Sequence, residues 1–350
     1  MQAPITHILP LTVIRRERLL PIPGKILVRK GQKVVANDII AEAELAPKHL
    51  ILDVCRGLGL SPEQADKEIK VRMGDEVEEG DVLAGPVGMT RRVIRSPGIG
   101  RIVVVESGQI LIALTGKPFA LKAGMPGEVQ DLIADRGAII ETTGALIQGV
   151  WGNGQIDSGV LHVLAKNPAN ELTPDHMDPS MRGSVIMAGY VEKAEVLKMA
   201  ADIPLKGMVL ASMHAGLIPL AQKLPFPLIL IEGFGDLSMN PAAFQLLETS
   251  EGRDTTLKAE AWNALSGARP EIIIPLPAPP DTGLPKETDV YKVGQQVRVL
   301  REPFFGQVGT ITFVEDRVEF PSGVRATGAS IRFEDGSSEM LPLANLEVLA

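Results

Sequence analysis

The stretch VRKGQKVVANDIIA at residues 28–41 returns as VRMGDEVEEGDVLA at residues 71–84. Six positions are identical at an offset of 43 residues: Val28/Val71, Arg29/Arg72, Gly31/Gly74, Val34/Val77, Asp38/Asp81 and Ala41/Ala84. Each copy alternates short apolar runs with a Gly-containing turn and an Asn-Asp or Gly-Asp turn, which is the pattern of a β-hairpin. The sequence therefore predicts one β-hairpin unit that is used twice.

These two units dominate a β-rich region that we expect to cover residues 1–168. Pro-Gly precedes an apolar run at residues 23–24, 97–98 and 126–127, as at corners between stacked strands. One inserted helix is announced by Ser61-Pro62-Glu63-Gln64, with Ser61 as N-cap and Gln64 completing a capping box. We expect the two hairpin units to form a single barrel that ends near Ala113.

The order of motifs in this region resembles a known fold. The pattern P-G-x-[IV], then V-x-x-G-x-x-V-x-x-x-D-[IV]-[IL]-A, then S-P-G-x-G-x-I-V-V-V is similar to the barrel-sandwich hybrid of biotinyl and lipoyl carrier domains over residues 20–113. Carriers of that family present a modifiable Lys at the tip of a hairpin. Here GPVGMTRRVIRS follows Ala84 without a Lys, and Lys48 in APKHL lacks the usual flanking residues. The resemblance therefore implies a non-carrier relative, and no cofactor is expected.

The period of the sequence changes over residues 183–276. The apolar runs SVIMAGYV, GMVLAS, PLILIEGF and EIIIPL are separated by the helix-like segments EKAEVLKMAAD, HAGLIPLAQKL and NPAAFQLLETSEG, and LKAEAWNALSGARP at 257–270 predicts a further helix. Continuous apolar strands that alternate with helices indicate a parallel sheet covered on both faces. We expect a small α/β domain here.

A Pro-rich stretch without periodicity, PAPPDTGLPKETD at 277–289, predicts a linker. Residues 290–350 then alternate apolar and polar positions and turn at Gly306, Gly309 and Asp335-Gly336. The order V-G-x-x-V-R-V-L, F-x-G-x-V-G-T-I, F-E-D-G and a final Asn-Leu-Glu-Val strand resembles the KOW-type SH3-like barrel of transcription elongation factors and ribosomal proteins. The expected fold class is thus multidomain β and α/β.

The KOW-type resemblance implies contacts with RNA, RNA polymerase or ribosomal proteins through the loop between the first strands. The candidate binding residues there are Arg298, Arg301, Phe304, Phe305 and Gln307. Residues 290–350 hold six Lys/Arg and eight Asp/Glu, so the electrostatic attraction of non-specific nucleic-acid binding is missing. The sequence favours a protein partner anchored by Phe304 or Phe305, with RNA contact as the open alternative.

A second candidate site lies at the carboxyl ends of the predicted parallel strands, where open α/β sheets bind ligands. Its residues are Ser212, His214, Glu232 and Asp236, of which Glu232 and His214 would form an acid–base pair. Neither a G-x-G-x-x-G nor a G-x-x-x-x-G-K-[ST] phosphate loop nor a G-x-S-x-G elbow occurs here. The structural interpretation is that Gly233 and Gly235 form a tight exit from a strand and that Asn240 caps the next helix.

Metal binding has little support in the sequence. The five histidines lie far apart, and only Asp175-His176-Met177-Asp178 has the density of a ligand set, within a segment whose Asp and Pro residues predict a connecting loop. Cys55 lies in an apolar segment and is interpreted as a buried structural thiol. No metal site is expected.

Composition bounds the class of protein. The 350 residues are 45% hydrophobic and 4% aromatic, with a net charge of −8 that gives no general attraction to nucleic acid. One cysteine, no signal-peptide pattern and no apolar run of about 20 residues predict a cytoplasmic protein without a membrane span.

Taken together, the motifs favour a non-catalytic adaptor or binding protein, linked to transcription or translation through the KOW-type barrel. The alternative is an enzyme or small-ligand sensor that uses the α/β domain. A third alternative is a self-assembling structural protein, in which the sheet edges pair chains into a homo-oligomer.

Overall fold

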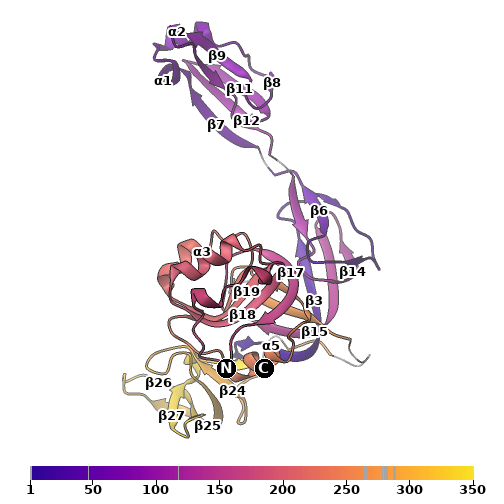
Figure 1. Cartoon of the computed structure of the whole chain (residues 1–350), viewed down its shortest axis with the longest axis vertical. Helices are drawn as coiled ribbons and strands as arrows, with labels where there is room; N and C mark the ends of the chain where they lie inside the picture. Colours follow the sequence, from indigo (N-terminus) through magenta and orange to yellow (C-terminus); the bar gives the residue numbers. More distant parts are fainter. Residues whose placement is uncertain are drawn as a thin grey trace.

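The computed structural model describes residues 2–45, 47–116, 118–263, 267–277, 279, 283–286 and 289–350. The chain is mostly β, in several sheets, none of which closes into a barrel within these residues. Figure 1 shows a central α/β body, a C-terminal sheet packed beside it and an arm that extends away from both.

The central sheet is mixed. Its four parallel strands lie in the order β20 (Leu228–Phe234), β19 (Gly207–Met213), β18 (Ser184–Val191) and β17 (Ile156–Val163), with β16 (Trp151–Gly152) antiparallel beside β20. Beyond β17 the strands β21 (Asp254–Lys258), β22 (Glu271–Pro275) and β15 (Gly137–Gln148) are antiparallel. The expected parallel sheet is therefore right for three of the predicted strands, while the fourth, EIIIPL, lies in the antiparallel half.

The helix expected over residues 257–270 is wrong. Leu257 and Lys258 end β21, where they pair with β17 on one side and β22 on the other. The described residues 259–263 and 267–270 are not helical, and residues 264–266 lie outside the described part of the chain. Pairing on both sides of β21 satisfies its backbone, and this tertiary effect outweighs the helical propensity of the Ala and Leu residues.

Helices cover both faces of this sheet, as expected. The helices α3 (Ala194–Asp202) and α4 (Ile218–Ala221), with the 3-10 turn η3 (Ala215–Leu217), pack on one face, and α5 (Pro241–Glu248) packs on the other. Asn240 is the N-cap of α5 and its side chain accepts a hydrogen bond from Ala243 N at 2.8 Å. The predicted cap is confirmed, and it places Asn240 next to the carboxyl end of β20.

The arm consists of two modules. The proximal module contains β4 (Lys25–Ile26), β5 (Lys33–Val34), β6 (Ile39–Ala43), β13 (Phe119–Lys122) and β14 (Gly127–Ile133), and it joins the body through the long strands β3 (Ile8–Leu19) and β15. The distal module, at the far end of the arm in Figure 1, contains β7 (Lys48–Asp53), α1 (Val54–Leu58), α2 (Pro62–Glu68), β8 (Glu76–Val77), β9 (Val82–Val87), β10 (Arg92–Arg95), β11 (Gly100–Glu106) and β12 (Gln109–Leu114). Ser61 is the N-cap of α2, as predicted.

The expectation of a single barrel built from both hairpin units is wrong. The first unit lies in the proximal module, whose core includes Ile40 and Val129, and the second lies in the distal module, whose core includes Leu83 and Ile102. Each unit is completed by its own hairpin, β14–β15 or β11–β12. The distal module is thus inserted between β6 and β13 of the proximal one.

The two modules use the same backbone pairing. Equivalent hydrogen bonds join Gly31 N to Val129 O and Gly74 N to Ile102 O (both 2.8 Å), Leu27 N to Ile40 O and Lys70 N to Leu83 O (2.8 and 2.9 Å), and Val35 N to Asp38 Oδ2 and Glu78 N to Asp81 Oδ2 (both 2.8 Å). The sequence repeat therefore reflects a repeated structure, with the Asp of each unit holding the same turn.

The C-terminal sheet has six strands in the order β2 (Ile5–Thr6), β28 (Leu346–Leu349), β24 (Gln296–Val299), β25 (Val308–Glu319), β26 (Arg325–Phe333) and β27 (Ser338–Pro342). The N-terminal strand β2 pairs in parallel with β28, and β1 (Gln2–Ala3) pairs with β23 (Asp289–Val290). Of the predicted linker, residues 278, 280–282 and 287–288 lie outside the described residues.

Strand pairing also crosses the predicted boundary at residue 168. The strands β15 and β17 belong to the first region of the sequence but pair with β22, β18 and β21 of the second.

No helix in the described residues is both long enough and apolar enough to span a bilayer.

Candidate binding pocket at the junction of two sheets

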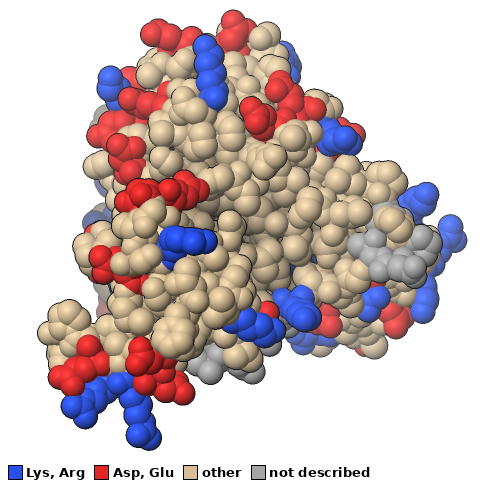
Figure 2. Space-filling model, turned by 90° about the horizontal axis from the view of Figure 1, so that it is seen from below, with Lys and Arg blue, Asp and Glu red and all other residues tan. Residues whose placement is uncertain are grey.

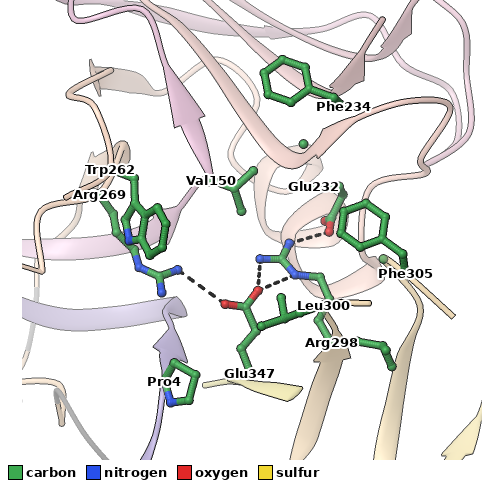
Figure 3. A pocket seen from close by; sticks show the side chains of 13 residues that line it. Pro4, Val150, Glu232, Phe234, Trp262, Arg269, Arg298, Leu300, Phe305 and Glu347 are labelled. Carbon is green, nitrogen blue, oxygen red and sulfur yellow. Dashed lines mark hydrogen bonds and ion pairs between the residues drawn. The ribbon is translucent and has the colours of Figure 1, made fainter. Parts of the chain in front are cut away.

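A pocket of about 470 Å³ lies where the central sheet, the C-terminal sheet and the N-terminal segment meet (Figure 3). Its walls are mainly apolar and include Pro4, Val150, Phe234, Trp262, Val299, Leu300 and Phe305. Three of these are aromatic, in a chain that has nine Phe, two Trp and two Tyr. Such a concentration of rings around one cavity is typical of a ligand site.

The end of β20 forms one side of the pocket. Glu232 is buried near the carboxyl end of this strand, and Gly233 and Gly235 follow with φ of 120° and 106°. Such φ values favour glycine, so the predicted tight exit from the strand is supported by the backbone. Gly233 lines the pocket, and a Cβ there would lie 3.5 Å from Val150 Cγ2.

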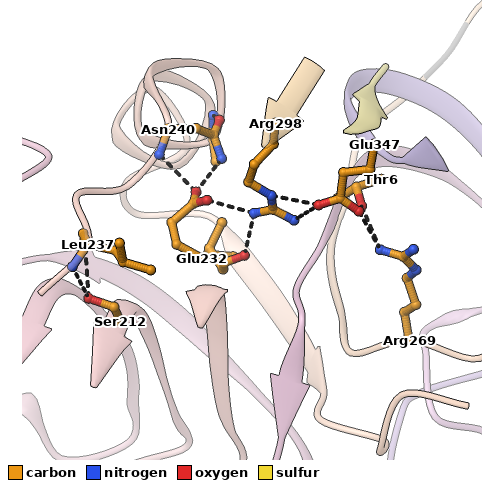
Figure 4. Close-up of polar contacts among 10 residues, drawn as sticks. Thr6, Ser212, Glu232, Leu237, Asn240, Arg269, Arg298 and Glu347 are labelled. Atoms are coloured by element: carbon orange, nitrogen blue, oxygen red, sulfur yellow. Dashed lines mark hydrogen bonds and ion pairs between the residues drawn. The ribbon is translucent and has the colours of Figure 1, made fainter. Parts of the chain in front are cut away.

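Four charged side chains border the pocket: Glu232, Arg269, Arg298 and Glu347, which we call the junction cluster (Figure 4). Arg298 Nη1 donates to Glu232 Oε2 at 2.6 Å and to Ile231 O at 3.0 Å. Its Nε donates to Glu347 Oε1 at 2.6 Å, and its Nη2 donates to the same oxygen. Arg298 on β24 therefore ties the central sheet to β28.

Neighbouring polar groups complete the cluster. Asn240 donates to Glu232 Oε1 through its backbone N (2.9 Å) and its Nδ2 (2.6 Å). Thr6 Oγ1 donates to Glu347 Oε2 at 3.0 Å and accepts from Arg269 Nη1 at 2.5 Å. Arg269 Nη1 also lies 3.6 Å from Glu347 Oε2, and its guanidinium stands 5.8 Å from the centre of the Trp262 ring.

The two carboxylates beside Arg298 favour its charged form. Burial lowers the pKa of Arg298, but the adjacent Glu347 and Glu232 carboxylates more than offset it, so the pKa is raised. Burial and the negative charge of Glu347 raise the pKa of Tyr291 to about 12. The Tyr291 hydroxyl donates to Leu346 O at 2.6 Å, which holds β28 in place. Arg298 is thus a fixed cation rather than a proton donor or acceptor.

The residues predicted around the first C-terminal loop separate into different environments. Arg298 is 2% exposed and borders the pocket, and its guanidinium forms the ion pairs between the two sheets. Phe304 stacks on Phe333 at 5.3 Å within the C-terminal core. Phe305 lines the pocket, whereas Arg301 and Gln307 are exposed and do not.

The charged surface offers no extended basic patch in the view of Figure 2. Small groups of Lys and Arg lie beside Asp and Glu around the rim of this face, and its broad middle is uncharged. Phosphate binding depends on several cations acting together. This face therefore adds no support to the alternative that the C-terminal region contacts RNA.

The acid–base pair expected in the α/β segment is not formed. His214 is exposed and its Nδ1 accepts from Gly216 N at 3.2 Å, while the hydrogen bonds of Glu232 go to Asn240 and Arg298. Ser212 is buried and its Oγ donates to Leu237 O at 2.7 Å, which fastens the loop after β20. Asp236 is exposed and does not line the pocket. The structure brings only Glu232 of these four residues to the pocket.

Sequence reasoning missed Trp262, Arg269 and Glu347. Trp262 and Arg269 lie in the stretch that was predicted to be a helix, and no sequence pattern indicates that they meet at the pocket. A pattern does exist for Glu347. It is the charged residue within the buried strand LEVL, as Arg298 is within QVRV, and the two residues are direct partners in the β24–β28 register. Opposite charges within two apolar strands that pair predict a buried ion pair.

Groups of three or more metal-ligating side chains do not occur within the described residues. In the Asp175–Asp178 segment, His176 Nδ1 accepts from Thr173 N at 3.2 Å and thus closes its own turn.

A scan against protein-family models and a search of curated proteins found no match.

Proposed function

We propose that the chain is a non-catalytic binding protein and that the junction pocket is its ligand site. One observation carries this proposal: the two carboxylates beside the pocket are engaged by Arg298, Asn240 and Thr6, while the walls are largely apolar and aromatic. Carboxylates fixed in this way suit a rigid binding site better than proton transfer.

The position of the pocket also supports binding. Ligand sites are common where separately folded parts of a chain meet. Here the walls come from the end of β20, the β24–β25 loop, the N-terminal segment and the loop that carries Trp262. The buried charges of the junction cluster hold these parts together, so the cavity is formed before a ligand arrives.

A protein partner is the second candidate for the occupant. Trp262 and Phe305 are 56% and 38% exposed at the pocket, and large aromatic side chains of this kind anchor protein interfaces. An adaptor role in transcription or translation would depend on such a protein contact and on the KOW-type identity that we propose for residues 290–350.

The non-carrier identity proposed for the arm has its own support. The β9–β10 turn of the distal module consists of Gly88, Met89, Thr90 and Arg91, so it presents no Lys.

Fluorescence of Trp262 tests the pocket directly. We replace the other tryptophan, Trp151, which stacks edge-on against Phe234, by Phe, and titrate the full chain with the uncharged probe N-phenyl-1-naphthylamine. We expect saturable quenching, weakened about tenfold by Phe305→Ala because one aromatic wall is lost.

The matched control is Phe313→Ala, which removes an exposed Phe from the same sheet at a position outside the pocket. It should leave the dissociation constant unchanged. Absence of saturable quenching, or equal effects of the two Phe substitutions, would contradict the proposal.

A further inference from the structure

We infer that the ligand of the junction pocket carries an anionic group beside a flat apolar body, and that Arg269 binds this anion. The inference rests on the proposed function, because it names the class of ligand for the same site. Three observations lead to it: the unused donors of Arg269, the occupied acceptors around it and the rings that face the cavity.

Arg269 has donors to spare. A guanidinium has five N–H groups, and within the described residues the side chain of Arg269 makes one hydrogen bond, from Nη1 to Thr6 Oγ1. Its contact with Glu347 Oε2 is an ion pair at 3.6 Å, longer than the 2.6 Å hydrogen bond from Arg298 Nε to Oε1 of the same carboxylate. The Arg269 side chain is 14% exposed and lines the pocket.

The other charges of the junction cluster are satisfied. Glu232 accepts three hydrogen bonds, two from Asn240 and one from Arg298. Glu347 also accepts three, two from Arg298 and one from Thr6. A cationic ligand would have to compete for these carboxylates, whereas an anionic ligand meets a guanidinium with N–H groups that none of the described residues accepts from. A planar carboxylate, or two oxygens of a tetrahedral sulfonate, can accept two parallel N–H groups of the guanidinium.

The rings set the shape of the rest of the ligand. In Figure 3 Trp262 and Phe305 lie on opposite sides of the floor formed by Arg298 and Glu347, and Phe234 stands above it. A flat apolar group placed between these rings gains stacking contacts. The Arg269 guanidinium lies by the Trp262 ring, at the side of the cavity where an acidic substituent of that group would reach it.

Two probes that share the same aromatic ring system test separately the anion at Arg269 and the apolar body between the rings. 8-Anilinonaphthalene-1-sulfonate carries a sulfonate that N-phenyl-1-naphthylamine lacks. We titrate both into the full chain with Trp151→Phe, with and without Arg269→Gln, and follow the quenching of Trp262. We expect Arg269→Gln to weaken binding of the sulfonate by about tenfold to a hundredfold, since a charge-assisted hydrogen bond is lost, and to leave the uncharged probe within about twofold.

Unchanged binding of the uncharged probe also shows that Arg269→Gln keeps the pocket folded. The control is Arg332→Gln, which removes one exposed Arg from the C-terminal sheet outside the pocket and should affect neither probe. If Arg269→Gln weakens both probes equally, or neither, the assignment of the anion to Arg269 is overturned while the pocket stands. If neither probe quenches Trp262 in the parent chain, the proposed function fails as well.

Discussion

The junction cluster has a counterpart inside the central sheet, and the two differ in what surrounds them. The second group, which we call the sheet cluster, consists of Arg16, Lys258, Glu260 and Glu271. Both contain two cations and two anions, but in the sheet cluster only Lys258 and Glu271 are buried, whereas the Arg16 and Glu260 side chains are 24% and 29% exposed. The sheet cluster sits on or directly after β3, β21 and β22 of one sheet and lines no part of the junction pocket, whereas the junction cluster joins two sheets beside it. The cavity, rather than the charge, distinguishes a candidate site.

The two clusters are also neighbours through the N-terminal segment. Thr6 forms hydrogen bonds with Glu347 and Arg269 of the junction cluster, and the next residue, His7, donates its backbone N to Gln148 Oε1 at 3.1 Å. Gln148 Nε2 in turn donates to Glu271 Oε1 at 3.2 Å. Two adjacent residues of the N-terminal segment, Thr6 at the end of β2 and His7 after it, therefore contact polar groups linked to both clusters.

The largest effect should come from removing the central cation of the junction cluster. Arg298→Met leaves Glu232 and Glu347 buried without their main partner, at 4% exposure each. Breaking a buried ion pair from one side costs about 3 to 5 kcal/mol of folding stability. Urea unfolding followed by circular dichroism measures the change.

A rescue experiment distinguishes charge from packing. Adding Glu232→Gln and Glu347→Gln to Arg298→Met removes the uncompensated charges and should recover a large part of the lost stability. If the triple variant is no more stable than Arg298→Met, the loss of stability comes from packing rather than from uncompensated charge.

The junction shows what could and could not be predicted from the sequence. The sequence pattern located β18, β19 and β20, which are continuous apolar runs buried on both faces. It also located the strands of residues 290–350, whose alternating apolar positions form the C-terminal core. The repeat located both hairpin units but could not show which strands complete them, since β14 and β11 offer the same pairing to either unit. The pocket depends on Pro4, Trp262 and Phe305, which lie far apart along the chain and meet only through tertiary packing.

The second prediction concerns Glu271 of the sheet cluster and its dependence on pH. Burial raises the pKa of this carboxyl group, but Lys258 and Arg16 lower it more, so that it falls from an ordinary 4.5 to about 2. The folded state therefore favours the charged form, and the stabilisation is present above pH 4.5 and is lost as the pH falls toward about 2. The amount is about 3 kcal/mol.

Unfolding of the parent chain and of Glu271→Gln between pH 2 and pH 6 checks this value. The Gln variant should be less stable at pH 6 and should lose less stability on acidification, because it has no carboxyl group to protonate at this position. Parallel pH profiles for the two proteins would show that Glu271 keeps an ordinary pKa and that the sheet cluster is weaker than its geometry indicates.

The smallest effect should come from Arg15, the immediate neighbour of Arg16. Arg15 and Glu141 are direct partners across β3 and β15, and their ion pair measures 2.6 Å, as short as the pair between Arg16 and Glu271. The Arg15 side chain is 50% exposed, however, so water solvates it in both the folded and the unfolded state. Arg15→Gln should therefore cost less than about 1 kcal/mol, and added salt should reduce even that difference. The same urea titrations measure it beside Arg298→Met. A loss as large as that of Arg298→Met would mean that distance rather than burial decides what an ion pair contributes in this protein, and the contrast between buried and exposed charges would not hold.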